Sequence, residues 1–277
     1  MRFPAVVLPW FLTAVAGTGA LTSQELLLAT TTSVRDSGLL DELLPDFQAE
    51  TGIRVLVVAV GSGAALRMGA EGNVDALLTH APDGEMELLE AGQAVSRIPF
   101  MQNHFLIAGP IDDPGEVTSA QSAVGAIRRL AAAEASWVSR DDDSGTHRRE
   151  NALLSAAGVD PGEGWPGFIR PGSGMGLSLQ VAGERRAYIL ADLGTFLALG
   201  RRAGLVALFS SDDESLRNIY SYLRIDPERF SRVHAAEAKT LEEYLLRPAT
   251  LARITSFGQE RFGTALFGAL ELAHETP

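Results

Sequence analysis

The sequence of 277 residues contains no cysteine and only one lysine, Lys239. Without cysteine the chain has no disulfide framework, no thiolate metal site, no cysteine nucleophile and no acylated cysteine anchor. Its five histidines do not show the spacing of a metal-binding helix. We therefore expect neither a structural transition-metal site nor a bound cofactor.

Positive charge is also scarce. Lys and Arg number 23 against 35 Asp and Glu, which gives a net charge of −12. A field of this sign repels nucleic acids and anionic membranes, so we expect neither as a partner. It also repels a free anion, so an anion-binding site here would need local donors strong enough to outweigh the global charge.

Long apolar runs are absent after the N-terminus. There, Arg2 precedes an apolar stretch over 3–16 and the small residues Thr18, Gly19 and Ala20. This is the order found in a secretory signal peptide, and the run is shorter than the roughly 20 residues of a spanning helix. We predict a signal peptide over residues 1–20 and export to the periplasm, with an uncleaved membrane anchor as the alternative.

The remaining chain alternates short apolar runs with amphipathic stretches. Strands are expected at 26–29, 53–60, 74–79, 105–108, 137–139, 188–191 and 205–209, and helices at 37–50, 64–68, 83–91, 119–134, 144–157, 175–182 and 195–199, with more helices in the tail from Lys239 through Phe267. Such alternation predicts an α/β fold with parallel-rich sheets flanked by helices. A turn-rich segment at 109–114 and a return segment at 212–226 divide the chain. We predict one lobe from 21–108 plus 218–277, and a second from 109–217.

Hydroxyl-rich and glycine-rich turns follow several of these strands. They are Thr30 to Ser33, Gly61 to Gly63, Ser139 to His147 and Pro171 to Gly176. Turns of this kind lie at the carboxyl edge of a parallel sheet and open helices, whose free N–H groups attract anions. Any one of them is also ordinary capping chemistry. Together they predict a small oxyanion site in which Arg140 supplies the full positive charge.

Six stretches, in order along nearly the whole chain, resemble the tungstate-binding periplasmic components of tungstate ABC transporters. They are residues 29–40 (ATTTSVRDSGLL), 60–63 (VGSG), 77–83 (LLTHAPD), 139–147 (SRDDDSGTH), 172–176 (GSGMG), and 257–258 with 262–267 (FG and FGTALF). One departure is the segment Arg217-Asn218-Ile219-Tyr220, where the family usually has Asn-Pro-Tyr.

The resemblance implies a two-lobed periplasmic-binding-protein fold, similar to type II, with the ligand cleft between the lobes. Carried over residue by residue, it implies that the ligands are Thr32, Ser33, Ser62, Arg140, Ser144, Gly145 and Thr146. We add Thr31 from the same turn, and keep Gly63, His80 and Ser173 as further candidates. The implied function is capture of tungstate, or molybdate, by a monomer that delivers it to an ABC permease without catalysis.

Two alternatives remain open. The pattern Arg140-x-Asp142-x-Ser144-Gly145-Thr146 is similar to that of phosphate-binding proteins, in which an aspartate accepts the proton of the ligand. Tungstate carries no such proton at neutral pH, so a free carboxylate would repel it. The other alternative is a secreted serine hydrolase that uses Ser144 or Ser62 with His147 or His80, although the chain lacks the G-x-S-x-G elbow at Ser62.

Overall fold

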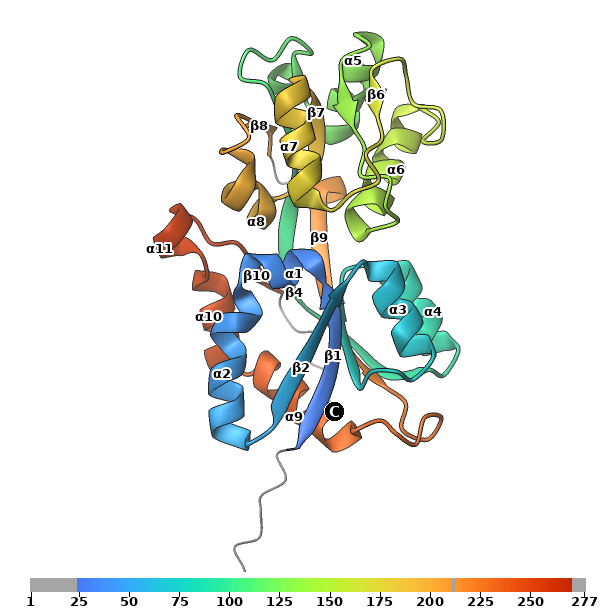
Figure 1. Cartoon of the computed structure of the whole chain (residues 1–277), viewed down its shortest axis with the longest axis vertical. Helices are drawn as coiled ribbons and strands as arrows, with labels where there is room; N and C mark the ends of the chain where they lie inside the picture. Colours follow the sequence, from blue (N-terminus) through green and yellow to red (C-terminus); the bar gives the residue numbers. More distant parts are fainter. Residues whose placement is uncertain (1–23, 211–212, 271–277) are drawn as a thin grey trace, which may run out of the picture.

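The computed structural model describes residues 24–210 and 213–270. They form two α/β lobes arranged end to end along the long axis of the molecule (Figure 1). The predicted signal peptide, residues 1–20, lies outside the described residues. Within those two ranges, none of the helices has the length and apolar composition that crossing a membrane requires.

The first lobe contains a sheet in the order β2-β1-β3-β9-β4, with helices on both faces. β1 pairs in parallel with both β2 and β3, whereas β9 is antiparallel to β3 and β4. The elements are β1 (Glu25–Thr31), α1 (Thr32–Ser37), α2 (Leu39–Thr51), β2 (Arg54–Val60), α3 (Ser62–Ala70), β3 (Ala76–Thr79), α4 (Pro82–Glu90), β4 (Ala94–Gly109), β9 (Arg217–Ile225), α9 (Ala235–Leu246), α10 (Pro248–Ser256), α11 (Gln259–Phe262) and β10 (Gly268–Ala269).

Alternation of side chains along β1 gives this lobe two cores. Leu26 and Leu28 pack in one core with residues of α2, α9 and α10. Ala29 faces the other side and packs with residues of α3 and α4. Helices cover both faces of the sheet. The turns that follow β1, β2 and β3 therefore meet at the end of the sheet formed by the carboxyl ends of these strands.

The second lobe continues the same hydrogen-bonded strand order as β4-β7-β5-β6, with β8 also paired to β4. β5 is parallel to β6 and β7. Helices α5 and α6 cover one face and α7 with η2 the other. The elements are η1 (Val117–Ser119), α5 (Ala123–Ala132), β5 (Trp137–Val138), α6 (Gly145–Ala157), β6 (Phe168–Ile169), α7 (Met175–Arg185), β7 (Tyr188–Asp192), α8 (Leu193–Thr195), η2 (Phe196–Gly200), β8 (Val206–Phe209) and η3 (Glu214–Leu216).

Two strands, β4 and β9, connect the lobes (Figure 1). β4 pairs with β9 as far as His104, and from Phe105 onward it pairs with β7. Phe105 and Ile107 pack in the core of the second lobe. The change of partner therefore lies inside β4, before the turn at 109–114 at which the sequence placed the boundary, and residues 105–108 pack with the second lobe.

The departure at 217–220 falls at the start of β9. Arg217 and Asn218 pair with His104 and Asn103 of β4, so the return crossing is a regular antiparallel strand. The Asn218 side chain donates to Asn103 Oδ1 at 2.8 Å and to the Tyr220 hydroxyl at 2.9 Å. The first of these buried hydrogen bonds connects the two crossing strands beside the cleft, and the second lies within β9.

Candidate functional site: a small pocket between the lobes

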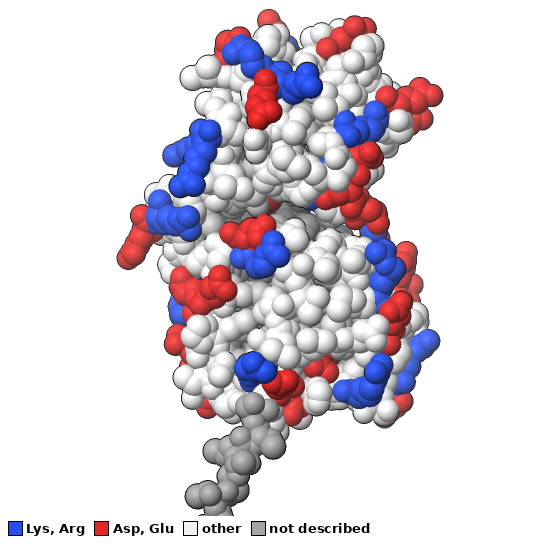
Figure 2. Space-filling view, in the orientation of Figure 1, with Lys and Arg blue, Asp and Glu red and all other residues white. Residues whose placement is uncertain are grey.

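A small pocket lies between the two lobes where the strand-to-helix turns meet. Its volume is about 20 Å³, far below the several hundred cubic ångströms of a site for an organic ligand. Its lining residues are Thr31, Thr32, Ser33, Asp36, Val60, Gly61, Ser62, His80, Arg140, Ser144, Gly145, Thr146, Met175 and Thr195. In the space-filling view a furrow runs across the molecule between the lobes (Figure 2).

The first lobe contributes hydroxyl groups to the pocket from the turns after β1 and β2. Thr31 caps α1 and accepts from the Val34 N–H at 3.4 Å, and its hydroxyl lies 3.0 Å from that of Ser33. Ser62 opens α3 and is 1% exposed, and its hydroxyl has no hydrogen-bond partner among the residues that the structure describes. A buried hydroxyl without a partner is costly, so Ser62 is available to donate to a ligand.

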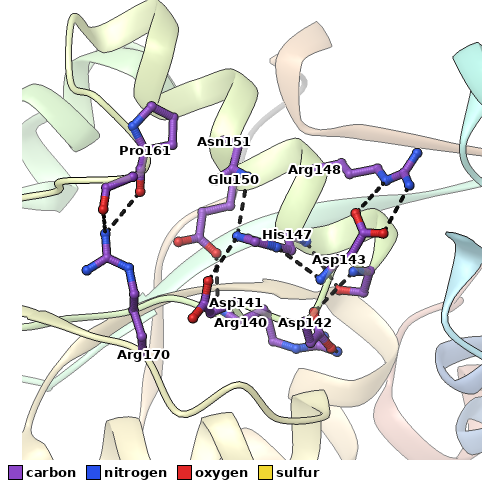
Figure 3. Close-up of polar contacts among 12 residues, drawn as sticks. Arg140, Asp141, Asp142, Asp143, His147, Arg148, Glu150, Asn151, Pro161 and Arg170 are labelled. Atoms are coloured by element: carbon purple, nitrogen blue, oxygen red, sulfur yellow. Dashed lines mark hydrogen bonds and ion pairs between the residues drawn. The ribbon is translucent and has the colours of Figure 1, made fainter.

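Arg140, from the loop after β5, supplies the positive charge of the pocket. It is 4% exposed. Its Nε donates to the Ser173 carbonyl at 2.8 Å, and its Nη2 forms an ion pair with Asp142 (Figure 3). Its backbone N–H donates to Glu150 Oε2 at 3.1 Å. These contacts fix the guanidinium in one orientation.

Helix α6 begins at the same pocket. Its cap, Ser144, accepts from the His147 N–H at 3.3 Å, and the next residues, Gly145 and Thr146, line the pocket. The first N–H groups of a helix of 13 residues carry partial positive charge. Thus the start of α6 and Arg140 present donors to the same small volume.

Asp142 is turned toward protein donors. Its Oδ2 pairs with Arg140 and its Oδ1 accepts from the Ser144 N–H at 3.2 Å. Asp142 does not line the pocket. A carboxylate engaged in this way is not placed to accept a proton from a bound ligand. Asp36 does line the pocket, but it is exposed and pairs with Arg35.

Glu150 holds the loop that carries Arg140. This residue of α6 is buried, and burial raises the pKa of its carboxyl group. Hydrogen bonds from Trp137, Ser139 and the Arg140 backbone act in the opposite direction on that pKa. The Trp137 indole N–H donates to Oε1 at 2.9 Å. Glu150 is therefore a structural link between the core of the second lobe and the pocket.

His80 follows β3 and lies against the start of α6. Burial lowers the pKa of its imidazole to about 4, with the nearby Arg140 and Arg149 acting in the same direction and a hydrogen bond with Asn218 opposing them. The ring is therefore neutral at neutral pH. A Cβ on Gly145 would lie 2.3 Å from His80 Cε1, so the two residues touch across the cleft.

Most of the residues predicted from the sequence come together here. Thr31, Thr32, Ser33, Ser62, His80, Arg140, Ser144, Gly145 and Thr146 all line the pocket. Gly63 lies on α3 beside Asp143 and Arg148, outside the lining. Ser173 does not line the pocket either. Its carbonyl accepts a hydrogen bond from Arg140, and its hydroxyl lies 3.0 Å from that of Ser178.

Five lining residues were not among the predicted ones: Asp36, Val60, Gly61, Met175 and Thr195. Gly61 belongs to a turn that the sequence did single out. Thr195 reaches the pocket because Asp192 caps the short helix α8, accepting from the Thr195 N–H at 2.9 Å. No local sequence signal connects this turn to the others, since its position depends on how the lobes pack.

Neither serine of the hydrolase alternative is hydrogen-bonded to the ring of the histidine considered as its base. His147 Nδ1 accepts from the Asp143 N–H at 3.1 Å, and its Nε2 lies 3.3 Å from the Asn151 amide, so the ring does not contact the Ser144 hydroxyl. Ser62 Oγ and His80 Nδ1 each lack a partner and so are not bonded to one another. Among residues 24–210 and 213–270 no cluster of His, Asp and Glu could hold a metal cation. Hydroxyls, helix N–H groups and one guanidinium suit a small anion.

Comparisons with known proteins agree with this geometry. Residues 16–247 match the family described as PBP superfamily domain. The tungstate-binding protein TupA of Peptoclostridium acidaminophilum is 39% identical over 244 residues, which cover 87% of this chain and 84% of that protein.

Two solved structures of similar proteins share the fold. The structure of the tungstate ABC transporter from Geobacter sulfurreducens has a TM-score of 0.77 and 39% identity, covering 84% of this chain and 98% of that one. The tungstate-binding protein TupA from Desulfovibrio alaskensis G20 has a TM-score of 0.78 and 35% identity, covering 89% and 99%. The predicted two-lobed fold is thereby confirmed. The chain belongs to the PBP superfamily and, within it, to the family of TupA tungstate-binding proteins.

Proposed function

We propose that this protein captures tungstate in the pocket between its lobes and delivers it to the permease of an ABC transporter. The observation that carries the proposal is the pocket itself, a volume of about 20 Å³ to which both lobes contribute hydroxyls, helix N–H groups and a buried guanidinium. Such a site fits an ion of a few atoms. The family relatives named for tungstate support this choice of ion.

The proposed ligands are Thr31, Thr32, Ser33 and Ser62 from the first lobe, and Arg140, Ser144, Gly145 and Thr146 from the second. An anion that contacts both sets joins the lobes, so binding favours the closed cleft over the open one. No bond of the ligand is made or broken. We propose a monomer that acts in the periplasm, in agreement with the signal peptide predicted from the sequence.

The orientation of Asp142 favours tungstate over phosphate. Phosphate at neutral pH carries a proton and benefits from a carboxylate that accepts it. Here both oxygens of Asp142 are already engaged, by Arg140 and the Ser144 N–H. A fully deprotonated dianion such as tungstate or molybdate has no proton to donate and needs only donors around it.

Isothermal titration calorimetry with sodium tungstate, molybdate, sulfate and phosphate tests the proposal. We expect tungstate to bind with the lowest dissociation constant, molybdate to follow, and sulfate and phosphate to bind at least about 100-fold more weakly, equivalent to roughly 2.7 kcal/mol. Tight phosphate binding with weak tungstate binding would contradict the assigned ligand. Heat from none of the four anions would contradict an oxyanion site altogether.

A further inference from the structure

A second cavity lies beside the pocket in the same cleft. Its volume is about 260 Å³, compared with about 20 Å³ for the pocket. Residues 80–84, from β3 into α4, form its wall on the first lobe, and α6 forms the wall on the second. Phe105 and Asn218, on the crossing strands, also line it. This cavity is too large to be shaped for one inorganic ion, but it adjoins a pocket that has that size.

The two cavities are separated by a contact between the lobes. His80 and Gly145 line both of them. The imidazole belongs to the first lobe and Gly145 begins α6 in the second, and they touch so closely that a Cβ on Gly145 would overlap the ring. Because the two residues belong to different lobes, opening of the cleft would move them apart and join the cavities. The ring is neutral because burial lowers the pKa of His80, so the imidazole places no charge between the two cavities.

Arg149 faces this second cavity without an ion-pair partner. Its Nη2 donates to the Arg217 carbonyl at 3.3 Å, and in the described part of the chain no carboxylate lies within 4 Å of its guanidinium. Every other arginine there that is buried or half-buried pairs with a carboxylate, namely Arg97, Arg140, Arg217, Arg224, Arg247 and Arg253.

An unpaired, half-buried cation is unfavourable for the free protein, and burial lowers the pKa of Arg149. Asp83 lines the same cavity and acts on Arg149 through space. The neighbouring Arg148 is neutralised by Asp143 at 3.3 Å. Arg149 therefore has a nearby opposite charge but no direct ion pair, so its guanidinium can attract an anion into the cavity, whereas the Asp83 carboxylate repels one.

Building on the proposed function, we propose that the larger cavity is the vestibule through which the oxyanion reaches the pocket, and that Arg149 captures the incoming ion. The net charge of −12 repels a dianion at long range. A guanidinium in a cleft with low-dielectric walls offsets that repulsion where the ion must pass. Arg149 then affects how fast the anion arrives, whereas Arg140 and the hydroxyls determine how long it stays.

Stopped-flow fluorescence with sodium tungstate tests this assignment, because Trp137 is linked through Glu150 to the Arg140 backbone and is placed to report binding. At low ionic strength we expect Arg149→Gln to lower the association rate constant about fivefold, with a dissociation rate constant within about twofold of wild type. Asp83→Asn should raise the association rate constant by a similar factor. Both effects should shrink to less than about twofold in roughly 0.5 M salt.

Arg229→Gln is the control, because it removes the same single positive charge from an exposed arginine that also donates to a backbone carbonyl, that of Ala91. Arg229 lines neither the pocket nor the larger cavity, so its substitution should leave the association rate constant unchanged. Unchanged association rates in Arg149→Gln and Asp83→Asn, or an effect of Arg149→Gln confined to dissociation, would overturn the vestibule while leaving tungstate binding intact. Absence of tungstate binding by the wild-type protein in calorimetry would instead overturn the proposed function, and the vestibule with it.

Discussion

Arg140 is held by three contacts with other residues of the protein. Its backbone is fixed by Glu150, its Nε by the Ser173 carbonyl and its Nη2 by Asp142. A donor that is already oriented loses little conformational freedom when it binds, so more of its interaction energy contributes to affinity. The Asp142 pairing also offsets the cost of burying the guanidinium.

We predict that Arg140→Gln weakens tungstate binding by at least about 100-fold, because it removes the positive charge that lines the pocket and its charge-assisted hydrogen bonds. Calorimetric titration measures the loss, and thermal unfolding without ligand checks that the variant is folded. Arg253→Gln, which removes the ion pair of a half-buried arginine with the exposed Asp46 on the first lobe, serves as the control and should bind as wild type. Affinity within twofold of wild type in Arg140→Gln would contradict the role assigned to it.

The residues that sequence patterns could single out are those in turns with an evident donor chemistry. Arg140, Ser62 and the turn around Thr31 fall in this class, and the structure brings them to one pocket. Gly63 does not line it, since one step along a helix turns a residue by about 100° from its neighbour. Thr195 was missed because its place depends on the contact of α8 with α1 across the cleft, which no local pattern records. That Arg140, Ser62 and the turn around Thr31 bind the anion stays a prediction.

At the scale of elements, the start of α6 is one of the parts of the second lobe that meet the first. Gly145 allows the helix to approach His80, whose ring lies 4.9 Å from that of Tyr220 and 6.5 Å from that of Phe105, measured between centroids. A ring packed in this way has little room to move. The absence of a side chain at Gly145 is therefore what permits the lobes to come together at the pocket.

Gly145→Ala should keep the lobes apart and weaken tungstate binding by about tenfold or more, since overlap of this kind costs roughly 1–3 kcal/mol. Small-angle X-ray scattering at saturating tungstate should show a larger radius of gyration than for wild type. Gly174→Ala is the control, because a Cβ there meets nothing within 4 Å at the start of α7. A Gly145→Ala protein that closes and binds like wild type would show that this contact does not limit closure.

Hydrophobic periodicity located most strands and helices, but two elements show its limits. The expected strand at 105–108 is the end of β4, which begins at Ala94 and runs through both lobes. Its first half contains Pro99 and mixed polarity, so it has no clear strand pattern. The expected helix at 37–50 is preceded by a separate helix, α1, because Gly38 adopts a left-handed conformation with φ of 84°. The short helix that carries Thr32 and Ser33 was therefore missed.

At the scale of the whole molecule, a protein with a net charge of −12 is proposed to bind an anion, which its overall field repels. Figure 2 shows charged side chains of both signs on the upper lobe, beside the furrow and along the margins of the lower lobe, while the middle of the lower lobe is largely uncharged. The donors for the anion are enclosed between the lobes, where solvent screens them least. In the proposed mechanism, closing the cleft separates the anion from the repulsive surface and strengthens its contacts with Arg140 and the helix starts.

Anomalous X-ray diffraction from crystals grown with tungstate tests the central claim most directly, because the anomalous signal gives the position of the tungsten atom without any assumption about its ligands. We expect a single dominant anomalous peak in the pocket between the lobes, within hydrogen-bonding distance, through its oxygens, of Ser62, Arg140 and the start of α6. A dominant peak on the outer surface of one lobe, with the pocket free of tungsten, would contradict it.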